Sequence, residues 1–111
     1  MTQDINDLQE YLEGILERAR HHAGNVNEIV LTLAGAVIWK KDTGSDLTVK
    51  QYRGQPANIL WVKIKEKRYA FCYNHSTEKV EMREGTLKGE AKYTFDNETT
   101  ASQIFQIFDD L

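Results

Sequence analysis

The stretch that decides the fold is residues 59–74, Ile-Leu-Trp-Val-Lys-Ile-Lys-Glu-Lys-Arg-Tyr-Ala-Phe-Cys-Tyr-Asn. Successive side chains of a strand point to opposite faces, so alternate apolar residues of the first arm predict one core-facing side: Leu60, Val62 and Ile64. The second arm, residues 69–74, alternates aromatic residues with smaller ones and predicts a second strand. Charged residues at 65–68 separate the two arms, and the stretch therefore predicts an antiparallel hairpin.

The same period of two continues on both sides of this hairpin. Residues 47–52, 79–83 and 91–95 read as further strands between turn-forming segments. Short connections favour antiparallel pairing of consecutive strands, so we expect a five-stranded antiparallel meander. The chain has 111 residues and no internal repeat or linker, which predicts a single α+β domain over residues 1–111.

Helical patterns flank the predicted sheet. Behind Asp4, a good N-cap, apolar residues recur at helical spacing and predict an amphipathic helix over about residues 4–22. At the other end, Thr100 and Gln103 have the spacing of a capping box and precede a dense apolar stripe. We therefore expect a C-terminal helix packed on the sheet.

Residues 26–41 allow two interpretations. Their apolar positions fit a helical stripe, but many are β-branched and would also suit a buried strand. Asn27 as a cap and Lys40 at the negative end favour a helix, although Gly35 would cost about 1 kcal/mol in its interior. We expect a helix, the second of two ahead of the sheet, with a strand as the alternative.

Composition excludes several classes of protein. The net charge is −3, with 41% hydrophobic and 28% charged residues, which rules out collagen-like, disordered and coiled-coil chains. No apolar run reaches the ~18 residues that span a bilayer, and the first residues are acidic rather than basic. The single cysteine, Cys72, cannot form an internal disulfide. These features predict a cytoplasmic protein without a membrane span.

Part of the chain resembles the small α+β proteins encoded by integron gene cassettes. The segments that carry the resemblance are NILWVKI (58–64), KRYAFCYNH (67–75), EMREG (81–85) and FDN (95–97). The resemblance implies a mobile, accessory bacterial gene and often an oligomer. It implies no reaction and transfers no catalytic residue.

Catalytic and metal-binding interpretations find little support. His21 and His22 are adjacent on a predicted helix and point about 100° apart, so they suit its C-terminus better than one shared metal ion. Cys72 and His75 would project to opposite faces of a strand, so a buried thiol is expected rather than a nucleophile with its base. No Gly-rich phosphate loop or nucleophile elbow occurs. We expect a non-enzymatic protein with no cofactor and no metal.

The charged residues raise two smaller questions. The basic residues of the hairpin, Lys63, Lys65, Lys67 and Arg68, lie near Trp61 as in a single-strand nucleic-acid surface, but the acidic net charge favours a solvated hairpin edge. Asp109 and Asp110 occupy the unfavourable negative end of the last helix. We therefore expect a basic neighbour for them, with Lys63, Lys65 and Lys67 as candidates.

The aromatic residues leave two arrangements open. Trp61 falls on the strand face opposite to Leu60, and if Tyr69, Phe71 and Tyr73 align with it, the sheet carries a second apolar face for an interface or a ligand. If the register instead places them in the core, no such face exists.

Two functional hypotheses follow. The first is a non-enzymatic protein that forms a homo-oligomer through the aromatic sheet face or the apolar helices and binds a partner protein or a small ligand. The alternative is a small hydrolase or ligand-sequestering protein with a pocket between sheet and helices, lined by Trp39, Trp61 and Tyr73.

Overall fold

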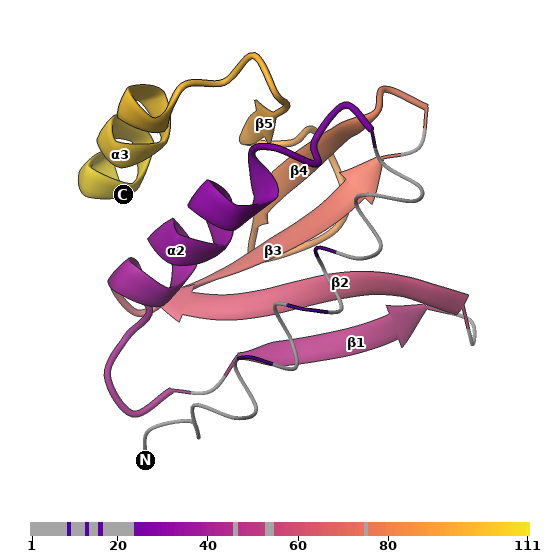
Figure 1. The fold of residues 1–111 in the computed structure, drawn as a ribbon. Helices are drawn as coiled ribbons and strands as arrows, with labels where there is room; N and C mark the ends of the chain where they lie inside the picture. Colours follow the sequence, from indigo (N-terminus) through magenta and orange to yellow (C-terminus); the bar gives the residue numbers. More distant parts are fainter. Residues whose placement is uncertain are drawn as a thin grey trace.

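The computed structural model describes residues 9, 13, 16, 24–45, 47–52, 55–74 and 76–111. Helices cover one face of an antiparallel sheet, with strands in the order β1-β2-β3-β4-β5 (Figure 1). The strands are β1 (Thr48–Tyr52), β2 (Gln55–Ile64), β3 (Lys67–Asn74), β4 (Lys79–Glu84) and β5 (Tyr93–Phe95). The helices are α2 (Val30–Lys40) and α3 (Ala101–Asp110). The predicted α+β class, with its antiparallel sheet and C-terminal helix, is confirmed.

The central hairpin forms as predicted, with a tighter turn. Lys65 and Glu66 alone connect β2 to β3, and both have positive φ, 51° and 68°, as a two-residue hairpin turn requires. The carboxylate of Asp42 accepts hydrogen bonds from the backbone N–H of Lys65 (2.7 Å) and of Glu66 (2.8 Å). An acceptor from outside the hairpin therefore supports a turn that has no glycine.

The core lies between the sheet and the two helices. From the sheet it receives Leu60, Val62, Ile64, Tyr69, Phe71, Val80, Met82 and Phe95. From α2, α3 and the turn before α2 it receives Val26, Ile29, Val30, Leu33, Ala36, Val37, Ile104 and Phe108. Phe108 is fully buried and stacks on Phe71 with ring centroids 6.1 Å apart, which fixes α3 over the middle of the sheet.

Residues 26–41 adopt the helical alternative. The stripe predicted for a helix is the buried one, and Gly35 lies inside α2. The predicted N-cap was wrong, since the helix begins after Ile29, whose side chain cannot cap. Instead Oδ1 of Asn97 accepts hydrogen bonds from the backbone N–H of Glu28 (2.9 Å) and of Ile29 (3.1 Å). A residue 68 positions away in sequence thus satisfies the donors at the start of α2.

The C-terminal helix forms as its sequence predicts. Thr100 Oγ1 accepts from the backbone N–H of Gln103 (3.0 Å), and Gln103 Oε1 accepts from that of Thr100 (2.8 Å), so the capping box is confirmed. Ahead of the sheet, α2 is the one helix whose bounds fall within the described residues. The helix predicted over 4–22 lies outside them, except for three helical positions: Gln9, Glu13 and Leu16.

Candidate functional site

The outward surface of α2 is apolar. Its sequence, VLTLAGAVIWK, has one charged residue, Lys40, and its apolar side chains occupy both sides of the helix. While Val30, Leu33 and Val37 enter the core, the opposite side exposes Leu31 (55%), Ile38 (39%) and Trp39 (50%), with Gly35 between them. A helix with apolar residues on both sides is normally buried on both sides. Besides the exposed Thr32, the outward side of α2 is apolar and uncharged, which is the composition of a contact surface.

The exposed apolar surface continues onto α3. The rings of Trp39 and Phe105 stack with centroids 5.1 Å apart, and Phe105 remains 57% exposed. We call the surface formed by Leu31, Gly35, Ile38, Trp39 and Phe105 the helical patch. At its edge, Lys40 Nζ lies 4.2 Å from the centroid of the Trp39 ring and 3.5 Å from Asp109 Oδ1. Paired charges therefore flank the patch while its centre has none.

Lys40 also corrects the expectation for the last helix. The basic neighbour of Asp109 is this α2 residue, not Lys63, Lys65 or Lys67 of the hairpin. Asp110 accepts hydrogen bonds from Gln106 Nε2 at 3.0 and 3.1 Å. Helix packing of α2 against α3 decides this pairing, and the sequence alone does not show which helices are neighbours.

Tyr69, Phe71 and Tyr73 do not align with Trp61 to form a second apolar face. The two-residue turn pairs Leu60 with Phe71 and Val62 with Tyr69, so these two aromatic residues share the helix-covered side of the sheet. Both are buried, Phe71 at 5% and Tyr69 at 1% exposure, and burial raises the pKa of the Tyr69 hydroxyl. Tyr73 pairs with Val80 on that same side. Trp61 pairs with Ala70 on the other side, so the first of the two arrangements is wrong.

The predicted pocket residues also stay apart. Trp39 lies on the outside of the helical layer, Trp61 on the sheet face away from the helices, and Tyr73 on the face toward them. These three side chains therefore do not line a common cavity. An interface role for Trp61 remains a prediction.

The sheet face opposite the helices carries a polar network. Arg83 Nη2 donates to Glu81 Oε1 (2.7 Å), and Asn74 Nδ2 donates to Glu81 Oε2 (2.9 Å). These bonds lower the pKa of Glu81, first through Arg83 and then through Asn74, and Glu81 in turn raises the pKa of Arg83. Both side chains are only 12–15% exposed, so the network is a structural tie between neighbouring strands.

Cys72 and Trp61 belong to this same face. Burial, and then the charge of Glu81, raises the pKa of the Cys72 thiol, which keeps it protonated and a poor nucleophile. The guanidinium of Arg68 lies 4.3 Å from the centroid of the Trp61 ring and covers part of it. His75, proposed as a base for Cys72, lies outside the described residues, as do His21 and His22.

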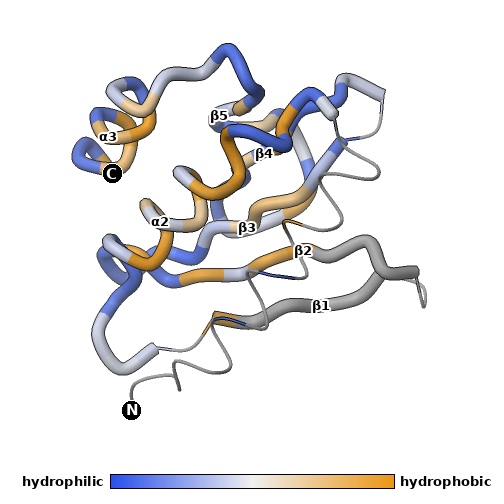
Figure 2. Tube along the Cα trace, in the orientation of Figure 1, coloured by the Kyte–Doolittle hydropathy of each residue, from blue (hydrophilic) through white to orange (hydrophobic). Residues whose placement is uncertain are grey.

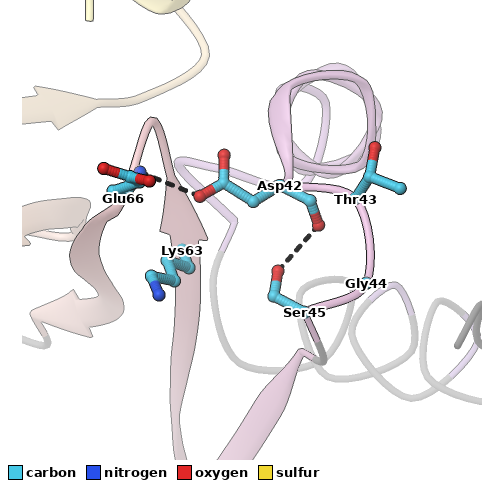
Figure 3. A pocket seen from close by; sticks show the side chains of 6 residues that line it. All are labelled: Asp42, Thr43, Gly44, Ser45, Lys63 and Glu66. Atoms are coloured by element: carbon cyan, nitrogen blue, oxygen red, sulfur yellow. Dashed lines mark hydrogen bonds between the residues drawn. The ribbon is translucent and has the colours of Figure 1, made fainter.

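An open pocket lies where the segment after α2 meets the β2–β3 turn. Figure 3 shows its lining residues, which are Asp42, Thr43, Gly44, Ser45, Lys63 and Glu66. The Asp42 carboxylate is used to hold the turn, and Ser45 Oγ donates to the Asp42 carbonyl at 2.8 Å. The polar atoms of Asp42 and Ser45 thus hold backbone together, and these six residues form no pair of a nucleophile and a base.

Two further kinds of site are not found in the described part of the chain. Within it, no group of three or more His, Cys, Asp or Glu side chains is arranged to hold a metal ion. None of its helices has the length and the apolar character needed to cross a membrane. The helical patch is the strongest candidate for function among the surfaces described, because its apolar side chains are contiguous and exposed.

Fold and surface together define a small α+β domain that packs helices on one face of an antiparallel sheet and keeps an apolar patch outside them. A family model described as "Integron cassette protein VCH_CASS1 chain" matches residues 8–104. The chain therefore belongs to this integron cassette protein family, as the sequence resemblance implied. No curated protein matches the chain.

The helical patch was only partly visible in the sequence. The sequence predicts association through the aromatic sheet face or the apolar helices and names Trp39 as a pocket residue, but it does not identify Leu31, Ile38 and Phe105 as the exposed residues of the helices. The available signal was the lack of charge on α2, where a surface helix normally has polar residues on its outer side.

Proposed function

We propose that this cassette protein is a non-enzymatic accessory protein that self-associates through the helical patch. The observation that carries the proposal is the contrast between the two sides of α2. One side is buried in the core, and the other is uncharged and exposes Leu31, Ile38 and Trp39 by 39–55%. Contiguous exposed apolar side chains on a small protein typically mark a protein interface. Charge depletion at the centre and aromatic residues are further features of interface cores.

Energetics support a reversible association. Fully burying a Leu, Ile or Phe side chain contributes about 1.5–3 kcal/mol, and the helical patch offers four large side chains that remain about half exposed. Trp39 is the residue type that most often dominates binding energy, and its stack on Phe105 already restrains its ring. Several kcal/mol of burial is thus available against the entropic cost of association.

Association through the helices leaves the other side of the sheet accessible. That side presents Trp61 with Arg68 above its ring and, beside it, the exposed Lys63. In this proposal the assembled protein binds a partner protein or a small ligand there, so its role within the cassette is binding rather than catalysis.

Variants that introduce a charge test the interface. Leu31→Glu and Ile38→Glu place a carboxylate in the patch centre and are expected to give monomers by light scattering after size exclusion, because burying an unpaired charge is costly. Leu87→Glu is the matched control, since Leu87 is 38% exposed on the β4–β5 connection and away from both helices. An oligomer that survives both patch variants, or that is lost equally in the control, contradicts the proposal.

A further inference from the structure

The sheet face opposite the helices is basic, although the whole chain has a net charge of −3. Among the residues whose side chains the structure describes, the charged ones on this face are Lys63, Arg68, Lys79, Arg83 and Glu81, with Asp96 reaching Lys79 from just after β5. Both carboxylates pair with a cation of the face, Glu81 with Arg83 and Asp96 with Lys79. Lys63 and Arg68 therefore carry a surplus of two positive charges.

These two cations face each other across β2 and β3. The register pairs Lys63 directly with Arg68, and both side chains are exposed. The ion pairs of the described residues include neither of them. In Figure 3, Lys63 points away from Asp42 and Glu66, the two acidic residues that line the neighbouring pocket with it. Like charges directly opposite each other destabilise a sheet, so this pair fits an anion supplied from outside the chain.

Trp61 adds an aromatic ring beside the two cations. It lies on the same face, is partly exposed, and has the Arg68 guanidinium 4.3 Å from its ring centroid. A guanidinium over an aromatic ring keeps N–H donors for a phosphate, and both groups offer flat surfaces on which a base can stack. Unpaired cations around a stacking surface are the combination by which proteins bind single-stranded nucleic acid.

The rest of this face does not have the apolar centre of a protein interface. From β3 toward β5 it carries the hydrogen-bonded network of Asn74, Glu81 and Arg83, and the neighbouring Ala70 is fully buried. A strand of nucleic acid needs no such centre, since its phosphates bind cations and its bases stack on single rings. The residues of the face therefore favour nucleic acid over a protein.

From these observations we infer that the hairpin end of the open sheet face binds single-stranded nucleic acid, with Lys63 and Arg68 on phosphates and Trp61 beneath a base. The inference goes beyond the proposed function, because it assigns this face to nucleic acid in place of a protein or a small ligand. It does not depend on self-association, which uses the other side of the molecule.

Binding of an oligothymidylate of about twelve nucleotides, measured by fluorescence anisotropy, tests the inference. Two phosphate contacts predict a slope of about −1.4 for the logarithm of the binding constant against that of salt concentration, or about a sevenfold loss of affinity between about 50 and 200 mM salt. In a Trp39→Phe background, the fluorescence of the remaining tryptophan, Trp61, should be quenched on binding.

Charge-removing variants of the hairpin locate the contacts. Lys63→Gln and Arg68→Gln should each reduce the salt slope to about −0.7, because each removes one phosphate contact. Lys67→Gln is the matched control, since Lys67 is exposed and pairs with Ile64 on the opposite face of the same hairpin. It loses the same charge and should leave the slope unchanged. Trp61→Ala should weaken binding at least about fivefold.

Three results would overturn the inference. The first is no binding of the oligonucleotide at about 50 mM salt up to millimolar protein. The second is an equal effect of Lys67→Gln and Lys63→Gln, or binding without quenching of Trp61, since the contacts would then lie elsewhere. The third is equal competition by a poly-glutamate peptide of the same length, which would indicate a site for an acidic protein. Sedimentation of the wild-type protein in the same buffer reports self-association separately, so either proposal can fail alone.

Discussion

Helices α2 and α3 lie side by side on the same sheet, but they differ in how their ends are capped and in how polar their exposed sides are (Figure 2). α3 has its own capping box, and its exposed side carries polar residues that include Gln106 and Asp110 beside one exposed apolar residue, Phe105. α2 has no side-chain cap of its own and no charge on its outward side. α3 therefore supplies its own cap and most of its own polar surface, while α2 depends on groups supplied from elsewhere, Asn97 at its start and, in our proposal, a second copy on its outside.

The largest effect on the free energy of unfolding is expected at Phe108 of α3. Comparing it with Phe105 of the same helix tests whether the core and the helical patch contribute separately to stability. Phe108→Ala removes a fully buried ring packed on Phe71 and Phe95 and should lower the free energy of unfolding by about 3–5 kcal/mol. Phe105→Ala removes a ring that is 57% exposed and should cost about 1 kcal/mol or less in dilute monomer. Urea unfolding measures both, and similar losses would contradict the division.

The caps provide the next largest effect. Asn97→Ala should lower the free energy of unfolding by about 1–2 kcal/mol, because it removes the acceptor for Glu28 and Ile29 and leaves those donors unsatisfied. Asn27→Ala is the control for the cap that the sequence predicted, and it should have the smaller effect, since Asn27 only accepts one bond from Asn97 Nδ2 (2.9 Å). Equal losses in the two variants would argue against capping by Asn97.

The ion pair between the helices gives the smallest effect. Asp109→Asn should lower the free energy of unfolding by about 0.2–1 kcal/mol at low salt, because Asp109 is half exposed and its pair with Lys40 is screened. Asp110→Asn is the matched control one residue along, with no salt bridge to α2 among the ion pairs of the described residues. A difference between the variants that persists in molar salt would contradict a screened pair.

Local chemistry explains what the sequence could predict. The hairpin arms and the capping box of α3 depend on residues close together in the chain, and both are found where the pattern places them. Which side chains of β2 and β3 share a face depends on the number of residues in the turn between them. The run of charged residues at 65–68 does not show how many of these residues belong to the turn. Because Lys67 already pairs with Ile64, Tyr69 and Phe71 enter the core and Trp61 does not.

Long-range partners explain what the sequence could not predict. Asn97 caps a helix 68 residues away, and Asp42 holds a turn more than 20 residues away. Neither partner has a local signature, since an Asn or Asp in a loop is common in any turn. The helical patch could not be predicted for the same reason: whether Leu31 or Ile38 is exposed depends on which elements pack beside α2, and the sequence does not show this.

The central claim is that the outward side of α2 is an interface between copies of the chain. Sedimentation equilibrium of the wild-type protein across about 1 to 100 µM tests it most directly, since association shifts with concentration by mass action. We expect a reversible shift from the 12.8 kDa chain mass toward twice that value. A single species of chain mass over the whole range would contradict it.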